Sequence, residues 1–301
     1  MNVFTKTQLE FVFFGVVFCG FFLELKVAAC PSPARSLHRG MRSLVFSLAW
    51  LCALPLHAQV KAPKTEFSDY LVAPVHVHRL ITPGELNLTT TLTAQDLEEI
   101  FRQVNRIWGH AGIHFPVATL TTEAAAHPNA YRQNYRSRNL RWMLALRPPN
   151  TRTPDHFHVY YLKRFLANGV YIGPGGMFVK DMAKLWKVEN GIEKPIPRVT
   201  SHELGHALTL NHRQEATNLM ASGTSGWTLN EAEIKQSRTA AQKLKWIRPA
   251  QEILARADAL YLEGKLPEAR AQYRLIAGIP MHCPETTRSK LRLKSQPKAP
   301  R

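Results

Sequence analysis

Three histidines and one glutamate stand close together between His202 and His212, in the sequence HELGHALTLNH. His202 and His206 are four residues apart, so on an α-helix their imidazoles share a face and can reach one metal ion. Glu203 follows the first ligand and is well placed to take a proton from a metal-bound water. His212 reaches the same ion only if the helix ends and the chain turns before it. Three protein ligands with one open position are typical of catalytic zinc, since structural zinc has four.

The spacing is more specific than the composition. With 13 histidines in 301 residues, chance alone gives the pattern HExxH in roughly one such sequence in thirty. A third histidine at a suitable offset lowers this to on the order of one in a thousand. The alternative interpretation is a surface helix that carries three histidines by chance.

The segment resembles the motif of the metzincin zinc metallopeptidases, HExxHxxGxxH followed by a Met-turn. The three histidines and the glutamate match that motif position by position. Residues 216–223 resemble the Met-turn, with Met220 eight residues after the last histidine, a gap similar to that of matrixin-type members. The resemblance implies a Zn²⁺-dependent endopeptidase in which Met220 packs beneath the ligands.

Two positions depart from the family motif. Thr209 stands where the family has glycine, at a turn whose left-handed backbone typically costs a β-branched residue about 1–2 kcal/mol. Either this turn is built differently or it is strained. Ser222 stands where some metzincins have a tyrosine near the metal. A gluzincin-type site, with Glu231 or Glu233 as third ligand, therefore stays open as an alternative.

The surrounding pattern predicts an α+β fold. Residues 75–80 and 156–162 read as strands, residues 94–108 as a long helix, and residues 111–115 lead into a further strand. A glycine-rich segment, 169–180, reads as a loop and edge strand before the helix with the zinc motif. This order resembles a metzincin domain: a twisted mixed sheet with a long helix and an active-site helix. The resemblance covers about residues 70–240.

The edge strand is also the predicted binding site for substrate. An exposed strand can pair with an extended peptide through backbone hydrogen bonds. The resemblance implies this role for the 169–180 segment, and we expect the substrate to contact Gly175, Gly176, Met177 and Phe178.

The N-terminal part reads as a leader. Residues 1–40 are interpreted as an over-extended N-terminus and residues 41–58 as a signal peptide, with a basic start, an apolar centre and LHA before Gln59. We therefore expect a secreted or periplasmic protein. An alternative is a lipoprotein anchored at Cys30. After Gln59 only Cys283 remains, so no intramolecular disulfide is expected.

The C-terminal part differs in character from the catalytic domain, predicted as residues 59–245. Residues 253–276 resemble a tetratricopeptide unit, but such units need about three in a stack to bury their apolar faces. We therefore expect a helical hairpin over residues 246–282. The basic tail, 283–301, is predicted to be disordered.

The net charge of +17 favours anionic partners, such as an acidic polypeptide or an envelope polymer. No nucleic-acid-binding motif accompanies this charge, so no nucleic acid is expected as a partner. We expect a monomer that acts on polypeptides.

Other histidines occur in pairs: His76 with His78, His156 with His158, and His110 with His114. Any pair could join a second metal site, but plain packing is the simpler interpretation, because no further ligand is evident. The overall prediction is a zinc endopeptidase with Glu203 as general base. The alternative from another class is a catalytically inactive metzincin-like scaffold that binds a partner.

Overall fold

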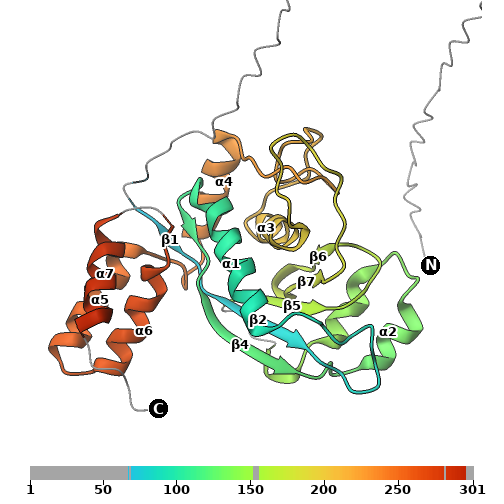
Figure 1. Ribbon diagram of the computed structural model, residues 1–301, viewed down its shortest axis with the longest axis horizontal. Coiled ribbons are helices and arrows are strands. Elements are labelled where there is room, and N and C mark those ends of the chain that lie inside the picture. The colour runs from blue at the N-terminus through green and yellow to red at the C-terminus, as the bar shows by residue number, and fades with distance from the viewer. Residues whose placement is uncertain (1–66, 68, 152–155, 281–282, 296–301) are drawn as a thin grey trace, which may run out of the picture. The chain divides into compact units, whose positions relative to one another are not determined.

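The computed structural model describes residues 67, 69–151, 156–280 and 283–295 (Figure 1). They all fall in one unit, Ala58–Arg301. The predicted leader, 1–40, and signal peptide, 41–58, with Cys30, lie outside the described residues. Among the described helices, none has the length and apolar character needed to cross a membrane.

The central sheet has five strands in the order β4-β2-β5-β7-β6. The first four of these run parallel to one another, and β6 is antiparallel to β7 at one edge, so the sheet is mixed. The strands are β2 (Val75–Leu80), β4 (Val117–Glu123), β5 (Phe157–Leu162), β6 (Gly169–Tyr171) and β7 (Met177–Lys180).

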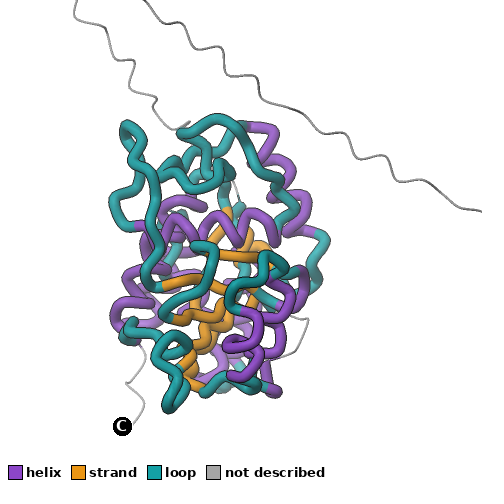
Figure 2. The backbone as a smooth tube through the Cα atoms, turned by 90° about the vertical axis from the view of Figure 1, so that its right-hand side faces the viewer, coloured by secondary structure: helices purple, strands orange, loops and turns teal. Residues whose placement is uncertain are grey.

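Helices α1 (Ala94–Gly109) and α3 (Pro195–Ala207) cover one face of this sheet (Figures 1 and 2). Thr93 and Asp96 form a capping box that fixes the start of α1. Its strong amphipathic pattern buries an apolar stripe, which joins the valines of β2 and Leu204 of α3 in the main hydrophobic core. The long helix predicted at 94–108 is therefore confirmed.

The opposite face of the sheet has its own apolar cluster. Leu80, Tyr160, Leu162 and Phe178 point to this side, because side chains alternate along a strand. They pack under α2 (Pro128–Asn134) and the 3-10 helix η1 (Leu140–Leu146), which are followed by the short η2 (Pro149–Thr151). The central strands β2, β5 and β7 are thus covered on both faces, as is typical of parallel strands.

A small second sheet pairs the first strand of the described chain with a strand that directly precedes the C-terminal helices. Its strands are β1 (Leu71–Val72), β3 (Ile113–His114) and β8 (Arg248–Pro249), in the order β3-β1-β8. Helix α4 (Glu231–Gln242) precedes β8, and α5 (Ala250–Leu262) and α6 (Leu266–Ala277) follow it. Ile253 and Ile276 pack against Tyr70 and Val72. The two helices of the predicted hairpin therefore bury apolar side chains against the N-terminal strand.

The prediction of a disordered tail from residue 283 is wrong for residues 284–295, which form helix α7 (Pro284–Ser295). Charge composition suggested disorder, but the basic side chains have partners on α5. Asp258 accepts ion pairs from Arg288 at 2.9 Å and Arg292 at 3.9 Å. The guanidinium of Arg292 also lies over the ring of Tyr261. These contacts stabilise a helix that the amphipathic pattern alone did not indicate.

The described fold is α+β, with mixed sheets and several helices, as the sequence predicts.

Candidate metal centre and cleft

Helix α3 carries the first two predicted ligands on one face. His202 is 7% exposed, and His206, one turn later, is half-buried. The Nδ1 atom of His202 lies 2.8 Å from the carbonyl oxygen of Leu219, and that of His206 lies 2.8 Å from the carbonyl oxygen of Leu210. A carbonyl only accepts hydrogen bonds, so both Nδ1 atoms carry the proton. Both Nε2 atoms therefore hold a lone pair.

The turn after α3 passes through the left-handed region of backbone space at Thr209, a conformation that favours glycine. Thr209 has a φ of 68°. Its N–H donates to the His206 carbonyl, and the N–H of Leu210 donates to the Gly205 carbonyl, as in a Schellman motif. Gln236 of α4 donates to the Thr209 carbonyl at 2.6 Å. The turn is thus strained rather than built differently, and a contact from α4 supports it.

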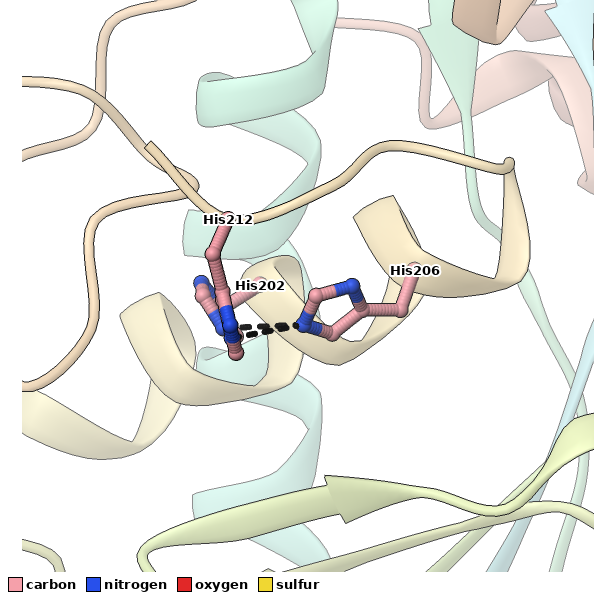
Figure 3. A group of neighbouring side chains, drawn as sticks. All are labelled: His202, His206 and His212. Atoms are coloured by element: carbon pink, nitrogen blue, oxygen red, sulfur yellow. Dashed lines mark hydrogen bonds between the residues drawn. The ribbon is translucent and has the colours of Figure 1, made fainter. Parts of the chain in front are cut away.

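This turn brings the third histidine back to the helix, as Figure 3 shows. The Nε2 atom of His206 lies 3.1 Å from that of His202 and 3.1 Å from that of His212. One ligand atom from each residue lies within 4.8 Å of the other two, and in the part of the chain described here this is the one group of three or more metal-ligating residues. The cluster, called the metal triad below, could hold a metal ion.

The contact between His202 and His206 is not an ordinary hydrogen bond. Each of the two facing Nε2 atoms holds a lone pair and no proton, so the contact is repulsive unless a cation lies between them. Ligands at 2.0–2.1 Å from a tetrahedral zinc ion are about 3.3–3.4 Å apart, close to the observed separation. The donor set therefore fits a zinc ion.

The electrostatics of the helix favour the ligating form of the imidazoles. Burial, helped by the charge of Arg198, lowers the pKa of His202 to about 3, although the hydrogen bond to the Leu219 carbonyl opposes the shift. Burial also lowers the pKa of His206. Neutral imidazole is the form that binds metal.

The predicted Met-turn lies against the same helix. Met220 is fully buried, and a Cβ added to Gly205 would lie 2.5 Å from its sulfur. Gly205 therefore allows the thioether to lie directly against the helix backbone between the two ligands. The Met220 N–H donates to the Asn218 side chain at 2.6 Å. The same loop presents the Leu219 carbonyl that orients His202.

Glu203 faces the edge strand β6. It is 5% exposed, and burial raises its pKa to about 8, while a hydrogen bond from the Tyr171 backbone and the charge of Arg198 oppose the shift. A Cβ added to Gly169 would lie 2.5 Å from the Glu203 carboxylate. Only glycine therefore lets the strand approach the carboxylate this closely. A divalent cation nearby would favour the ionised form of Glu203.

A cleft of about 720 Å³ runs between β6 and the loops that carry His212 and Ser222. The Asn168 carbonyl accepts from the Lys180 N–H of β7, and the Ile172 N–H donates to the Gly176 carbonyl just before β7. The backbone groups of the alternate residues Gly169 and Tyr171 therefore face away from the sheet. These groups lie at the cleft together with the metal triad and Glu203. The edge strand can therefore pair with an extended chain.

The structure corrects the predicted substrate contacts at Met177 and Phe178. Met177 and Phe178 belong to β7, which is paired with β5 on one side and β6 on the other, and both side chains are fully buried. Gly175 and Gly176 lie in and after the turn η3 (Gly173–Gly175) that connects β6 to β7. The sequence pattern indicated an edge strand, but it could not tell which half of the 169–180 segment lies at the edge.

The alternative third ligands are occupied elsewhere or lie outside the triad. Glu233 is fully buried and accepts hydrogen bonds from Arg213 at 2.7 Å and Asn218 at 2.8 Å. Glu231 is exposed at the start of α4. Neither joins the metal-ligating group that the described residues contain.

The paired histidines of β2 and β5 come together across the sheet. We call His76, His78, His156 and His158 the sheet cluster. His76 stands opposite His158 in the strand register, and their rings stack at 5.1 Å between centroids. The Nε2 atom of His78 lies 3.0 Å from the Nδ1 atom of His158. The third pair does not meet: His110 contacts the Trp227 ring, and His114 is buried in β3 beside Gly278.

Sequence reasoning missed three contributors to the site. The backbone of Gly169 and Tyr171 lies against the Glu203 side chain. A residue's type does not predict a backbone contact, so only the glycine could have indicated it. Arg198, one helical turn before His202, is 1% exposed and lines the cleft. Its position four residues before a ligand, on the same helix face, was the available signal.

Comparisons with known proteins add little to this description. No family model matches the chain, and no curated protein matches it. One of the similar solved chains, from "Structure of a chaperone-substrate complex", is 13% identical with a TM-score of 0.33, over 57% of this chain and 34% of that chain. This chain thus spans about a third of that protein, and a likeness at this level supports no conclusion on fold or function.

Proposed function

We propose that this protein is a zinc-dependent endopeptidase of the metzincin type. The observation that carries the proposal is the pair of unprotonated Nε2 atoms of His202 and His206, 3.1 Å apart, with His212 at the same distance from His206. His202, His206 and His212 would hold the ion. When bound, zinc supplies a Lewis acid that polarises a carbonyl and makes water a stronger nucleophile at neutral pH.

Glu203 is the general base of the proposed reaction. Its carboxylate accepts the proton of the attacking water and then gives it to the leaving amine, so the residue is unchanged after one turnover. The Tyr171 N–H and the edge strand hold this carboxylate on the cleft side of α3. Its burial excludes bulk water from the proton transfer.

The edge strand supports a polypeptide as the substrate. Backbone groups of Gly169 and Tyr171 face the cleft, and pairing of an extended peptide with them would place one peptide bond opposite the metal triad. Backbone hydrogen bonds do not depend on the side chains of the substrate, so pairing with β6 would accept peptides of many sequences. The signal peptide predicted from the sequence over residues 41–58 would export the protein.

The test combines metal analysis with cleavage of an unbiased peptide mixture by the purified protein. We expect one zinc per chain and cleavage that is lost in Glu203→Gln while zinc stays bound. The control is Glu215→Gln, which neutralises an exposed glutamate that contacts Thr217. Absence of zinc would overturn the proposal. Zinc without cleavage in either protein would favour an inactive scaffold that binds a partner.

A further inference from the structure

Arg198 is a buried cation at the cleft that forms no salt bridge with a carboxylate among the described residues, although the charge of Glu203 acts on it. None of the ion pairs found among the described residues involves it. Its Nε donates to the Gly226 carbonyl at 2.9 Å, and its Nη2 donates to the carbonyls of Asn218 and Ala221. A charge buried in this way is normally paired, since removal from water is costly.

One edge of this guanidinium is left open. The three hydrogen bonds use Nε and Nη2, and Nη1 has no partner in the described part of the chain. Arg198 lines the cleft together with Val199 and Leu185. Burial lowers the pKa of Arg198 to about 10, so the group stays charged at neutral pH. The open N–H groups of Nη1 therefore offer a charged donor for a ligand in the cleft.

The position of Arg198 relates this donor to the proposed reaction. It is one turn before His202 on α3, so both side chains are on the same side of the helix. A Cβ added to Gly169 would lie 2.6 Å from the Val199 side chain, which places this part of the cleft beside the start of β6. A peptide paired with β6 would pass over it within about one or two residues of the metal triad, given a rise of about 3.3 Å per residue.

We infer that Arg198 forms a carboxylate-binding subsite, and that this peptidase prefers substrates with a carboxylate next to the cleaved bond. The inference rests on the proposed function and names its substrate class. A charge-assisted hydrogen bond in a site shielded from water is stronger than one between neutral groups. The net charge of +17 is in keeping with anionic substrates. The carboxylate can belong to an aspartate or glutamate side chain or to the C-terminus of the substrate.

The test uses the unmodified protein and one peptide series. At each position beside the cleaved bond, aspartate and glutamate are compared with asparagine, glutamine and leucine, and each peptide is made with a free and an amidated C-terminus. We expect kcat/KM at least about tenfold higher for the carboxylate than for its amide at one position. The preference should persist in 0.5 M NaCl, where attraction to surface charge is screened.

The outcomes separate the two proposals. Equal rates for the aspartate and asparagine peptides would overturn the subsite while leaving the peptidase in place, and cleavage of none would overturn the peptidase. A preference that disappears on C-terminal amidation identifies the chain terminus as the carboxylate. The matched variants Arg198→Lys and Arg198→Met should lose the preference stepwise, measured as the ratio of kcat/KM for the carboxylate peptide to kcat/KM for its amide in the same zinc-loaded variant.

Discussion

Two groups of histidines in this protein share a residue type and a ring arrangement but differ in their chemistry. In the metal triad, the rings of His202 and His212 stack with centroids 5.2 Å apart. In the sheet cluster, the rings of His78 and His158 also stack with centroids 5.2 Å apart. Ring packing therefore does not distinguish the two groups.

The partners of the ring nitrogens do distinguish them. In the metal triad, backbone carbonyls accept from two Nδ1 atoms, which leaves lone pairs on the facing Nε2 atoms. In the sheet cluster, the Nδ1 atom of His78 meets the hydroxyl of Thr121 at 2.9 Å, which can donate or accept. A proton can therefore lie between His78 and His158, and their 3.0 Å contact is a normal hydrogen bond. The acceptor behind an imidazole, more than the number of imidazoles, determines whether it can bind a metal.

The largest difference is expected when one histidine is removed from each group. His206→Ala removes the central ligand of the triad, so bound zinc should fall from one per chain to near zero. The activity should fall about a thousandfold or more, since the ion supplies several kcal/mol of transition-state stabilisation. The matched variant His76→Ala removes a half-buried ring of the sheet cluster and should keep both the bound zinc and the activity. Metal analysis and kcat/KM measure these effects, and zinc loss in His76→Ala would contradict the distinction.

A smaller difference in zinc affinity is expected when a residue that supports the hydrogen-bond partner of a ring is replaced in each group. Asn218 holds the Met-turn loop through Met220 and Glu233, and this loop presents the carbonyl that orients His202. Asn218→Ala should weaken zinc binding about tenfold to a hundredfold, as loss of outer partners of metal ligands does. Titration with a competing chelator measures the affinity. Thr121→Val, which removes the hydroxyl behind His78, should leave zinc affinity unchanged; equal weakening in both variants would indicate a general loss of stability instead.

The sequence was sufficient for the candidate metal cluster and the main elements. The motif indicated the three histidines that lie together and could hold a metal ion, and periodicity predicted the helix at 94–108 and the strand at 75–80 correctly, because a local pattern determines each of them. The periodicity of β2 and β5 also placed paired histidines on one face of each strand. Periodicity could not predict the strand register that places His76 opposite His158, because pairing between distant strands is not a local property.

The remaining features depend on backbone groups, which the residue types do not reveal. The Leu219 and Leu210 carbonyls orient the rings of His202 and His206, and a residue of any type could supply such a carbonyl. The open edge of the sheet lies at β6, rather than at Met177 and Phe178, because β7 is paired on both sides. Helix α7 forms where charge alone suggested disorder, because Asp258 pairs with its arginines.

The buried sheet cluster should make the stability of the fold sensitive to acid. Burial, followed by the charges of His158 and His76, lowers the pKa of His78 to about 3. Between about pH 6.5 and pH 3 the unfolded chain therefore binds a proton at this position that the folded chain does not. The free energy of unfolding should be highest above pH 6.5 and fall on acidification by up to about 1.4 kcal/mol per pH unit from this site.

The variant His78→Gln isolates this contribution, because glutamine keeps hydrogen-bonding groups and does not titrate. Urea denaturation at a series of pH values with excess zinc should give a shallower acid slope for His78→Gln than for the wild type. The Glu123 carboxylate lies 3.4 Å from His78 Nδ1, and its pKa is raised by burial, so both groups favour their neutral forms. Parallel slopes for the two proteins would show that His78 is protonated in the folded state.

The smallest effect is expected at Thr209, in the turn between His206 and His212 of the metal triad. Its backbone is strained, whereas no residue of the sheet cluster has a positive φ. Among the described residues other than glycine, only Thr209 and Asn190 have a positive φ. Thr209→Gly should stabilise the protein by about 0.5–1 kcal/mol, because relief of the left-handed strain outweighs the greater freedom of glycine in the unfolded chain. Urea denaturation measures this gain, and zinc affinity should not change, because the hydrogen bonds of the turn are made by the backbone. Thr209→Ala keeps the Cβ while removing the hydroxyl, 3.4 Å from Gln236, and should give no gain. If both variants were more stable than the wild type, the hydroxyl of Thr209 would be the destabilising group, and the left-handed backbone would not.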